Sequence, residues 1–69
     1  MDVKENFGLR IKEIRKLRGM SQEQLASGSG LDRSYVSGIE QGKRNASLEV
    51  IAKLANVLEI QIKELFEEK

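Results

Sequence analysis

The sequence of 69 residues contains no cysteine and no histidine. Disulfide bonds are therefore excluded, and so are zinc sites built from thiolate or imidazole ligands. We expect no metal and no other cofactor. A fold this small buries only about 60% of its unfolded surface, so its stability as a monomer is marginal. Oligomerisation is the remaining way to stabilise it, and we expect a homodimer.

The missing histidine and cysteine also argue against an enzyme. A general acid–base or nucleophilic site would have to use isolated carboxylates or serines, and no spacing in the sequence suggests one. Membrane segments are missing as well, because no apolar run approaches the roughly 20 residues that a span requires. The charged start, Met1–Glu5, lacks the apolar region of a signal peptide. We expect a cytoplasmic protein.

The net charge of +1 hides an uneven distribution. Residues 1–46 hold nine Lys or Arg against six Asp or Glu, whereas residues 47–69 hold three against five. A basic bias over the first two-thirds of the chain suits an anionic partner, although an ordinary solvated surface would also account for it.

Apolar residues recur at spacings of three and four, and no segment alternates as a strand does, so the pattern predicts an all-α fold. We expect one domain over residues 1–69 with five helices. The first spans roughly residues 4–18 and ends at Gly19. Its apolar stripe consists of Phe7, Ile11, Ile14 and Leu17.

Two short helices follow. Ser21 and Gln24 match a capping box at the start of the second helix, which stops near Ser27–Gly30. The last glycine of that stretch lies in a tight turn and is predicted to have a positive φ. Asp32 is the expected N-cap of the third helix, and Gly42 ends it.

The C-terminal third is predicted to form two more helices. Ser47 is the N-cap of the fourth, whose apolar face consists of Leu48, Ile51, Ala52, Leu54, Ala55 and Leu58. A short fifth helix follows. We predict a dimerisation region at about residues 56–69, because its apolar residues exceed what one small core needs. The predicted interface residues are Leu58, Ile60, Ile62, Leu65 and Phe66. Simple packing over the first helix is the alternative.

Residues 21–42 have the organisation of a DNA-reading helix-turn-helix, in which the second helix enters the major groove. Arg33, Ser34 and Ser37 offer hydrogen-bonding groups within the first turn and a half of that helix. Arg33 can bind O6 and N7 of guanine together. Tyr35 can reach a phosphate or a base edge with its hydroxyl while its ring is partly buried. A solvated helix surface is the alternative for these residues.

The loop Lys43-Arg44-Asn45 follows the predicted reading helix. Its positive charge can hold backbone phosphates at the flank of a DNA site, or it can be a solvated loop. Gly38 is unusual, because a glycine inside a helix costs about 1 kcal/mol relative to alanine. Either the helix or the DNA is expected to pack closely at that position.

Nearly the whole chain resembles a known family. The residues that carry the resemblance are Ile14-Arg15, Ser21–Ala26, Gly30, Val36-Ser37, Ile39-Glu40, Gly42 and Ser47-Leu48. With them the sequence resembles the lambda Cro/repressor-type helix-turn-helix proteins, also called the XRE family. The block Leu31–Glu40, followed by Lys43-Arg44-Asn45, resembles the controller proteins of restriction-modification systems, which are dimers of about this length.

This resemblance implies a compact five-helix, lambda-repressor-like domain that regulates transcription as a homodimer on a pseudo-palindromic operator. It implies a phosphate contact by Gln22, base or phosphate contacts by Arg44 and Asn45, and a structural ion pair between Arg15 and Glu40. The implied partners are double-stranded DNA and a second copy of the chain, with RNA polymerase as a further candidate. An antitoxin-like protein-interaction module that keeps this fold is the alternative function.

One residue departs from the family pattern. Many family members carry proline where this chain has Ala46, so the loop before the fourth helix is expected to be less rigid here.

Overall fold

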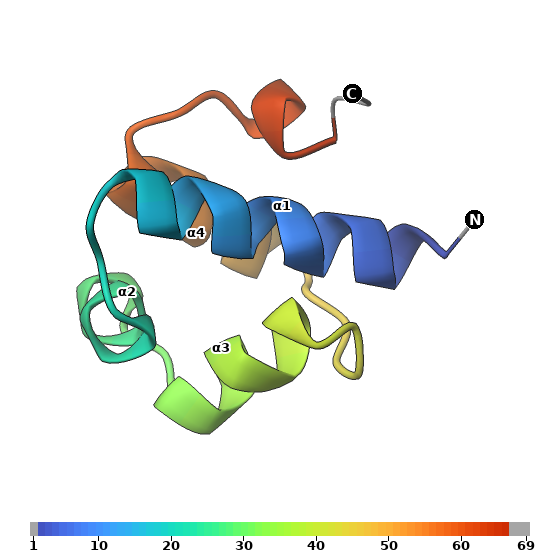
Figure 1. Ribbon diagram of the computed structural model, residues 1–69, viewed down its shortest axis with the longest axis horizontal. Coiled ribbons are helices and arrows are strands. Elements are labelled where there is room, and N and C mark those ends of the chain that lie inside the picture. Colours follow the sequence, from blue (N-terminus) through green and yellow to red (C-terminus); the bar gives the residue numbers. More distant parts are fainter. Residues whose placement is uncertain (1, 67–69) are drawn as a thin grey trace.

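The structure is a computed structural model that describes residues 2–66. These residues form four α-helices and one 3₁₀ helix (Figure 1). The elements are α1 (Val3–Leu17), α2 (Gln22–Ser29), α3 (Arg33–Glu40), α4 (Leu48–Leu58) and η1 (Ile62–Phe66). The predicted all-helical fold is confirmed. None of these helices is long and apolar enough to cross a membrane.

The prediction of five α-helices is wrong at the fifth element. The segment Ile62–Phe66 is a 3₁₀ helix of five residues, in which Glu64 N–H donates to the Gln61 carbonyl at 3.0 Å. The Glu64 carboxylate in turn accepts from Gln61 N–H at 2.7 Å. A segment this short gains few i to i−4 hydrogen bonds, so the tighter 3₁₀ pattern suffices.

The helix ends largely follow the sequence prediction. Ser21 and Gln24 form the predicted capping box, with Gln24 N–H donating to the serine hydroxyl at 3.0 Å and Ser21 N–H donating to the glutamine side chain at 2.8 Å. Ser47 caps α4 through Val50 N–H at 3.1 Å. Asp32 occupies the N-cap of α3, but within residues 2–66 its side chain accepts no capping hydrogen bond. The backbone therefore starts α3 without side-chain help.

The turn between α2 and α3 has the predicted geometry. Gly30 lies in the left-handed region with φ +68°, and Leu31 N–H donates to the Ala26 carbonyl at 2.8 Å. A β-carbon at Gly30 would meet no atom within 4 Å among the described residues. Glycine is therefore needed for its backbone conformation and not for space.

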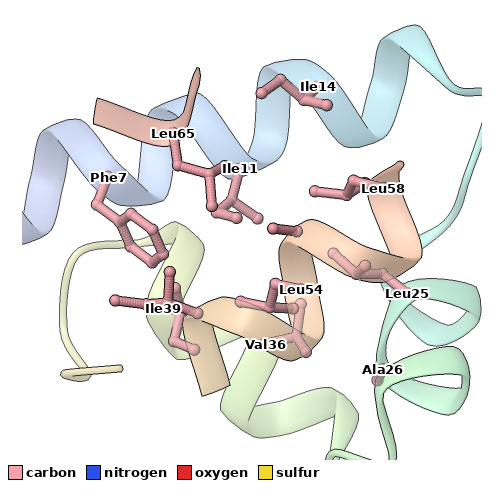
Figure 2. Packing of buried hydrophobic residues seen from close by; sticks show 12 residues of the cluster. Phe7, Ile11, Ile14, Leu25, Ala26, Val36, Ile39, Leu54, Leu58 and Leu65 are labelled. Atoms are coloured by element: carbon pink, nitrogen blue, oxygen red, sulfur yellow. The ribbon is translucent and has the colours of Figure 1, made fainter. Parts of the chain in front are cut away.

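The core is formed by all five elements (Figure 2). Helices α2 and α3 pack against the buried faces of α1 and α4 through Leu25 and Ala26 of α2 and Val36 and Ile39 of α3. Leu65 joins this core from η1. The complete set is Phe7, Ile11, Ile14, Leu25, Ala26, Val36, Ile39, Ile51, Leu54, Ala55, Leu58 and Leu65.

Three residues of the predicted apolar faces lie outside this core. Leu17 and Leu48 are each 83% exposed, and Ala52 is exposed as well. Leu17 is the last residue of α1 and Leu48 the first of α4, so each lies at a helix end. A periodic pattern does not tell where the partner helix stops.

Leu58 and Leu65 are 0% and 1% exposed, so both belong to the core of the single chain. The prediction that they contribute to a dimer surface is therefore wrong, and packing over the first helix is correct for them. Leu58 of α4 lies between Ile14 and Leu25 (Figure 2), and Leu65 is buried because η1 folds back onto α1. The Phe66 ring stacks on Phe7 with 5.3 Å between centroids, and Arg10 Nε donates to the Glu64 carbonyl at 2.8 Å.

Gly8 allows α1 and α3 to cross closely. A β-carbon at this position would overlap the Ile39 carbonyl oxygen and lie 2.9 Å from that of Glu40. Any larger residue would push the end of α3 away from α1. The helix-turn-helix lies on one side of α1 and η1 on the other (Figure 1).

Candidate nucleic-acid interface

Helix α3 is attached to the core along one face and exposed along the other. Val36 and Ile39 are 1% and 0% exposed and form the attached face. Arg33 and Ser34 are exposed in the first turn of the helix. The resulting outward face begins with the residues predicted to read DNA.

Ser37 and Tyr35 are half-buried and already engaged in hydrogen bonds. The Ser37 hydroxyl accepts from Gln41 Nε2 at 2.9 Å. The Tyr35 hydroxyl donates to the Asn45 carbonyl at 2.8 Å. Both bonds are at the surface, where a DNA phosphate or base can compete for the hydroxyl groups.

The loop after α3 folds back onto the helix. The Gly38 carbonyl accepts from both Lys43 N–H at 2.9 Å and Arg44 N–H at 3.2 Å. The Arg44 guanidinium carbon lies 5.3 Å from the centroid of the Tyr35 ring, which is a cation–π distance. Lys43, Arg44 and Asn45 are all exposed. The loop and α3 thus form one surface in the free protein.

This folding accounts for the unusual glycine inside α3. A β-carbon on Gly38 would overlap Cγ of Arg44, and Cβ and Cδ of Arg44 would both lie 3.5 Å away. The close neighbour of Gly38 is therefore the Arg44 side chain.

Behind this surface, Arg15 and Glu40 form the ion pair that the family resemblance implies. Arg15 Nε and Nη2 donate to the two carboxylate oxygens of Glu40 at 2.7 and 3.0 Å, and Nη1 donates to the Met20 carbonyl at 2.8 Å. Arg15 is 7% exposed and Glu40 6%. The hydrogen bonds to Glu40 raise the pKa of Arg15 above its ordinary value, although burial opposes the shift. The guanidinium of Arg15 therefore stays charged.

Gln22 joins the same network from the start of α2, where its Nε2 donates to Glu40 Oε1 at 3.0 Å. In the free protein its side chain is thus directed to the ion pair. An open hollow between the starts of α2 and α3 is lined by Arg15, Ser21, Gln22, Glu23 and Arg33. The predicted phosphate contact of Gln22 and the predicted base contact of Arg33 stay predictions, but the structure places both residues at one hollow.

The exposed part of the predicted dimer surface lies elsewhere. Ile62 and Phe66 are 47% and 49% exposed, and Ile60 is half-buried. Residues 67–69 of the predicted dimerisation region lie outside the described residues. In Figure 1 the η1 segment is on the opposite side of α1 from α3. A contact through η1 would leave α3 uncovered.

Sequence reasoning missed two structural positions. Gly8 had no distinguishing pattern, because a glycine inside a helix shows its purpose only once the crossing helix is known. Glu59 ends α4 with φ +59° and is the one non-glycine residue with positive φ within residues 2–66. Glycine or asparagine at that position would have been a recognisable stop signal.

The sequence and the fold both match known proteins. The profile of the helix-turn-helix family HTH_3 matches residues 11–65. The control protein C.MunI of a Mycoplasma species is 46% identical over 66 residues, covering 94% of this chain and 89% of that protein. The crystal structure of the restriction-modification controller protein C.AhdI from Aeromonas hydrophila is 56% identical with a TM-score of 0.89, covering 90% of this chain and 94% of that one.

A third match is a complex. The crystal structure of SinR, the master regulator for biofilm formation, in complex with DNA is 35% identical with a TM-score of 0.84. It covers 88% of this chain and 98% of that one.

Proposed function

The chain belongs to the helix-turn-helix family, and we propose that it regulates transcription as a homodimer on a pseudo-palindromic DNA operator. The observation that carries the proposal is the single surface formed by α3 and the loop after it. That surface is polar and basic, and it is fixed to the core by Val36 and Ile39. A protein-binding surface would more often be aromatic or apolar.

The residues proposed to contact DNA fall into two groups, those on α3 and those beside it. Arg33 at the start of α3 is the proposed base reader, because its fork of donors matches guanine O6 and N7. Ser34, Tyr35 and Ser37 supply hydroxyl groups along the same helix. Gln22, Lys43, Arg44 and Asn45 flank α3 and would contact phosphates or the groove edge.

A homodimer suits both the DNA and the protein surface. Two-fold symmetry would place two copies of α3 about 34 Å apart, one turn of DNA, so that each reads half of a palindrome. The proposed contact uses Ile62 and Phe66, each about half exposed, together with the partly covered Ile60. Apolar surface of this kind is commonly buried against an identical copy.

The similar proteins suggest which genes are controlled. C.MunI is named a control protein, and C.AhdI a restriction-modification controller. We infer that this chain controls the expression of restriction-modification genes, activating at one site and repressing at another. RNA polymerase is then a candidate partner, and the protein would act in the cytoplasm on the nucleoid.

Selection of bound sequences from random double-stranded DNA, at two salt concentrations, tests the proposal. We expect one enriched site with two-fold symmetry, whose affinity falls steeply as salt rises because phosphate contacts release counterions. If no sequence is enriched over nonspecific DNA, the regulator proposal fails, and an antitoxin-like interaction module becomes the better interpretation.

A further inference from the structure

We propose that Gly38 is a positioning residue that sets the pose of Arg44 on the DNA-binding surface; this inference rests on the proposed function. Glycine in the interior of a helix is unfavourable by about 1 kcal/mol relative to alanine. Gly38 lies in the middle of α3, which is only eight residues long. Its presence there needs a specific reason.

Backbone conformation does not supply that reason. The glycines with positive φ among residues 2–66 are Gly19, Gly30 and Gly42, so Gly38 has a backbone that any residue adopts. Neither does helix packing, because the three atoms nearest to a β-carbon at this position all belong to the Arg44 side chain. At Gly8, by contrast, the nearest atoms are backbone atoms of α3.

The missing β-carbon leaves room for the stem of Arg44 to cross α3. The Gly38 carbonyl holds the Lys43 and Arg44 amides, a role that any residue could fill. The open space above its α-carbon is specific to glycine, and Cγ of Arg44 occupies it. The guanidinium then reaches the Tyr35 ring at 5.3 Å, and the Tyr35 hydroxyl holds the Asn45 carbonyl.

An alanine at position 38 would therefore force Arg44 into another rotamer. Cγ is close to the backbone, so the side chain cannot avoid the new methyl group by moving only its far end. The guanidinium would leave the Tyr35 ring, and any DNA contact that depends on this pose would be lost. The helix itself would gain from the alanine. Gly38→Ala is thus expected to be at least as stable as the unmodified protein while binding DNA less tightly.

The test uses a DNA duplex selected from random sequence by the unmodified protein. Dissociation constants are measured for the unmodified protein, Gly38→Ala, Arg44→Ala and the double variant. Gly38→Ala is expected to weaken binding about tenfold, the worth of one charge-assisted contact. In the Arg44→Ala background the same substitution should change the dissociation constant by less than about twofold, because its effect passes through Arg44.

A tenfold loss that persists without Arg44 would overturn the inference, as would unchanged binding by Gly38→Ala. Thermal melting shows whether a loss of binding comes from a loss of stability. If Gly38→Ala melts at a lower temperature and the double variant does not recover, Gly38 is a structural residue and the inference fails. If no duplex is enriched in the selection, the proposed function fails first, and the pose of Arg44 is still measurable without DNA.

That measurement uses the only tyrosine of a chain that has no tryptophan. Tyr35 is the residue on which Arg44 stacks, so its near-ultraviolet circular dichroism and fluorescence report the pose directly. We expect Gly38→Ala to shift the signal in the same direction as Arg44→Ala. Gly28→Ala is the matched control, because the three atoms nearest to its β-carbon all belong to the Val57 side chain, the first at 3.1 Å, and none to Arg44 or Tyr35. A tyrosine signal that Gly38→Ala leaves unchanged would contradict the proposal.

Discussion

The guanidinium of Arg15 on α1 holds the carboxylate of Glu40 at the end of α3 through two hydrogen bonds of 2.7 and 3.0 Å. Gln22 at the start of α2 donates to the same carboxylate at 3.0 Å. Three helices therefore meet at one buried acidic group. The ion pair fixes the end of α3 relative to α1, next to the crossing at Gly8.

Arg15→Ala is expected to destabilise the fold by about 3 kcal/mol, because it leaves the Glu40 charge buried without a cation. For a domain of this size, that corresponds to a fall in melting temperature of roughly 12 °C or more. Arg18→Ala is the control, since Arg18 Nη1 lies 4.0 Å from the Glu59 carboxylate in an exposed pair worth at most about 1 kcal/mol, and its Nη2 donates to the Glu59 carbonyl at 3.3 Å at the surface. An unchanged melting temperature for Arg15→Ala would refute the structural role.

Ser29→Ala is expected to stabilise the protein. The Ser29 hydroxyl is buried in α2 and has no hydrogen-bond partner among residues 2–66. Removing an unsatisfied buried hydroxyl should gain about 1 kcal/mol, and alanine adds a few tenths as the better helix former. Ser27→Ala, exposed on the same helix, isolates the propensity gain. Chemical denaturation measures both, and equal gains would show that burial of the hydroxyl costs nothing.

Substitutions at Glu59 and Gly30 are expected to change the melting temperature in opposite directions. Both residues cap a helix with left-handed backbone, at φ +59° and +68°. A residue with a β-carbon is unfavourable there by about 1–2 kcal/mol. Glu59→Gly should therefore raise the melting temperature by about 4–16 °C, and Gly30→Ala should lower it by a similar amount. Changes of the same sign in both variants would contradict this account.

Arg33→Ala and Lys43→Ala are expected to affect DNA binding in different ways. Loss of Arg33 should relax specificity at one base pair per half-site, worth about 1–3 kcal/mol of discrimination. Loss of Lys43 should weaken binding to all sequences alike. It should also reduce the slope of the logarithm of the binding constant against the logarithm of the salt concentration by about 1. Binding to a panel of single-base operator variants separates the two. If Arg33→Ala weakens binding to all operator variants equally, Arg33 contacts a phosphate and not a base.

Ile62→Ser tests the proposed dimer contact. Burying an isoleucine side chain contributes about 1.5–3 kcal/mol, and a two-fold interface contains it twice, so association should weaken by more than about tenfold. Analytical ultracentrifugation over a concentration series measures the change. Leu17→Ser is the control, because Leu17 is 83% exposed at the end of α1, outside the proposed contact. Equal effects of the two substitutions would place the contact elsewhere.

The surface that buries the C-terminal leucines could not be predicted from the sequence. The apolar residues after Leu54 predict burial, but the pattern does not say against which surface. Leu58 and Leu65 are buried in the core of the single chain, whereas Ile62 and Phe66 are about half exposed. Burial in a core and burial in an interface require the same residue types, so only the path of the chain separates them.

The sequence by itself determined the four α-helices, the Ser21 capping box, the glycine turn at Gly30 and the placement of Arg33 on an outward face. Each of these depends on local spacing and local backbone conformation, which neighbouring residues fix. Only the tertiary structure decided what lies beside Gly38 and which helix crosses at Gly8. These contacts join residues that are distant in sequence or separated by a loop, and they depend on how the elements pack.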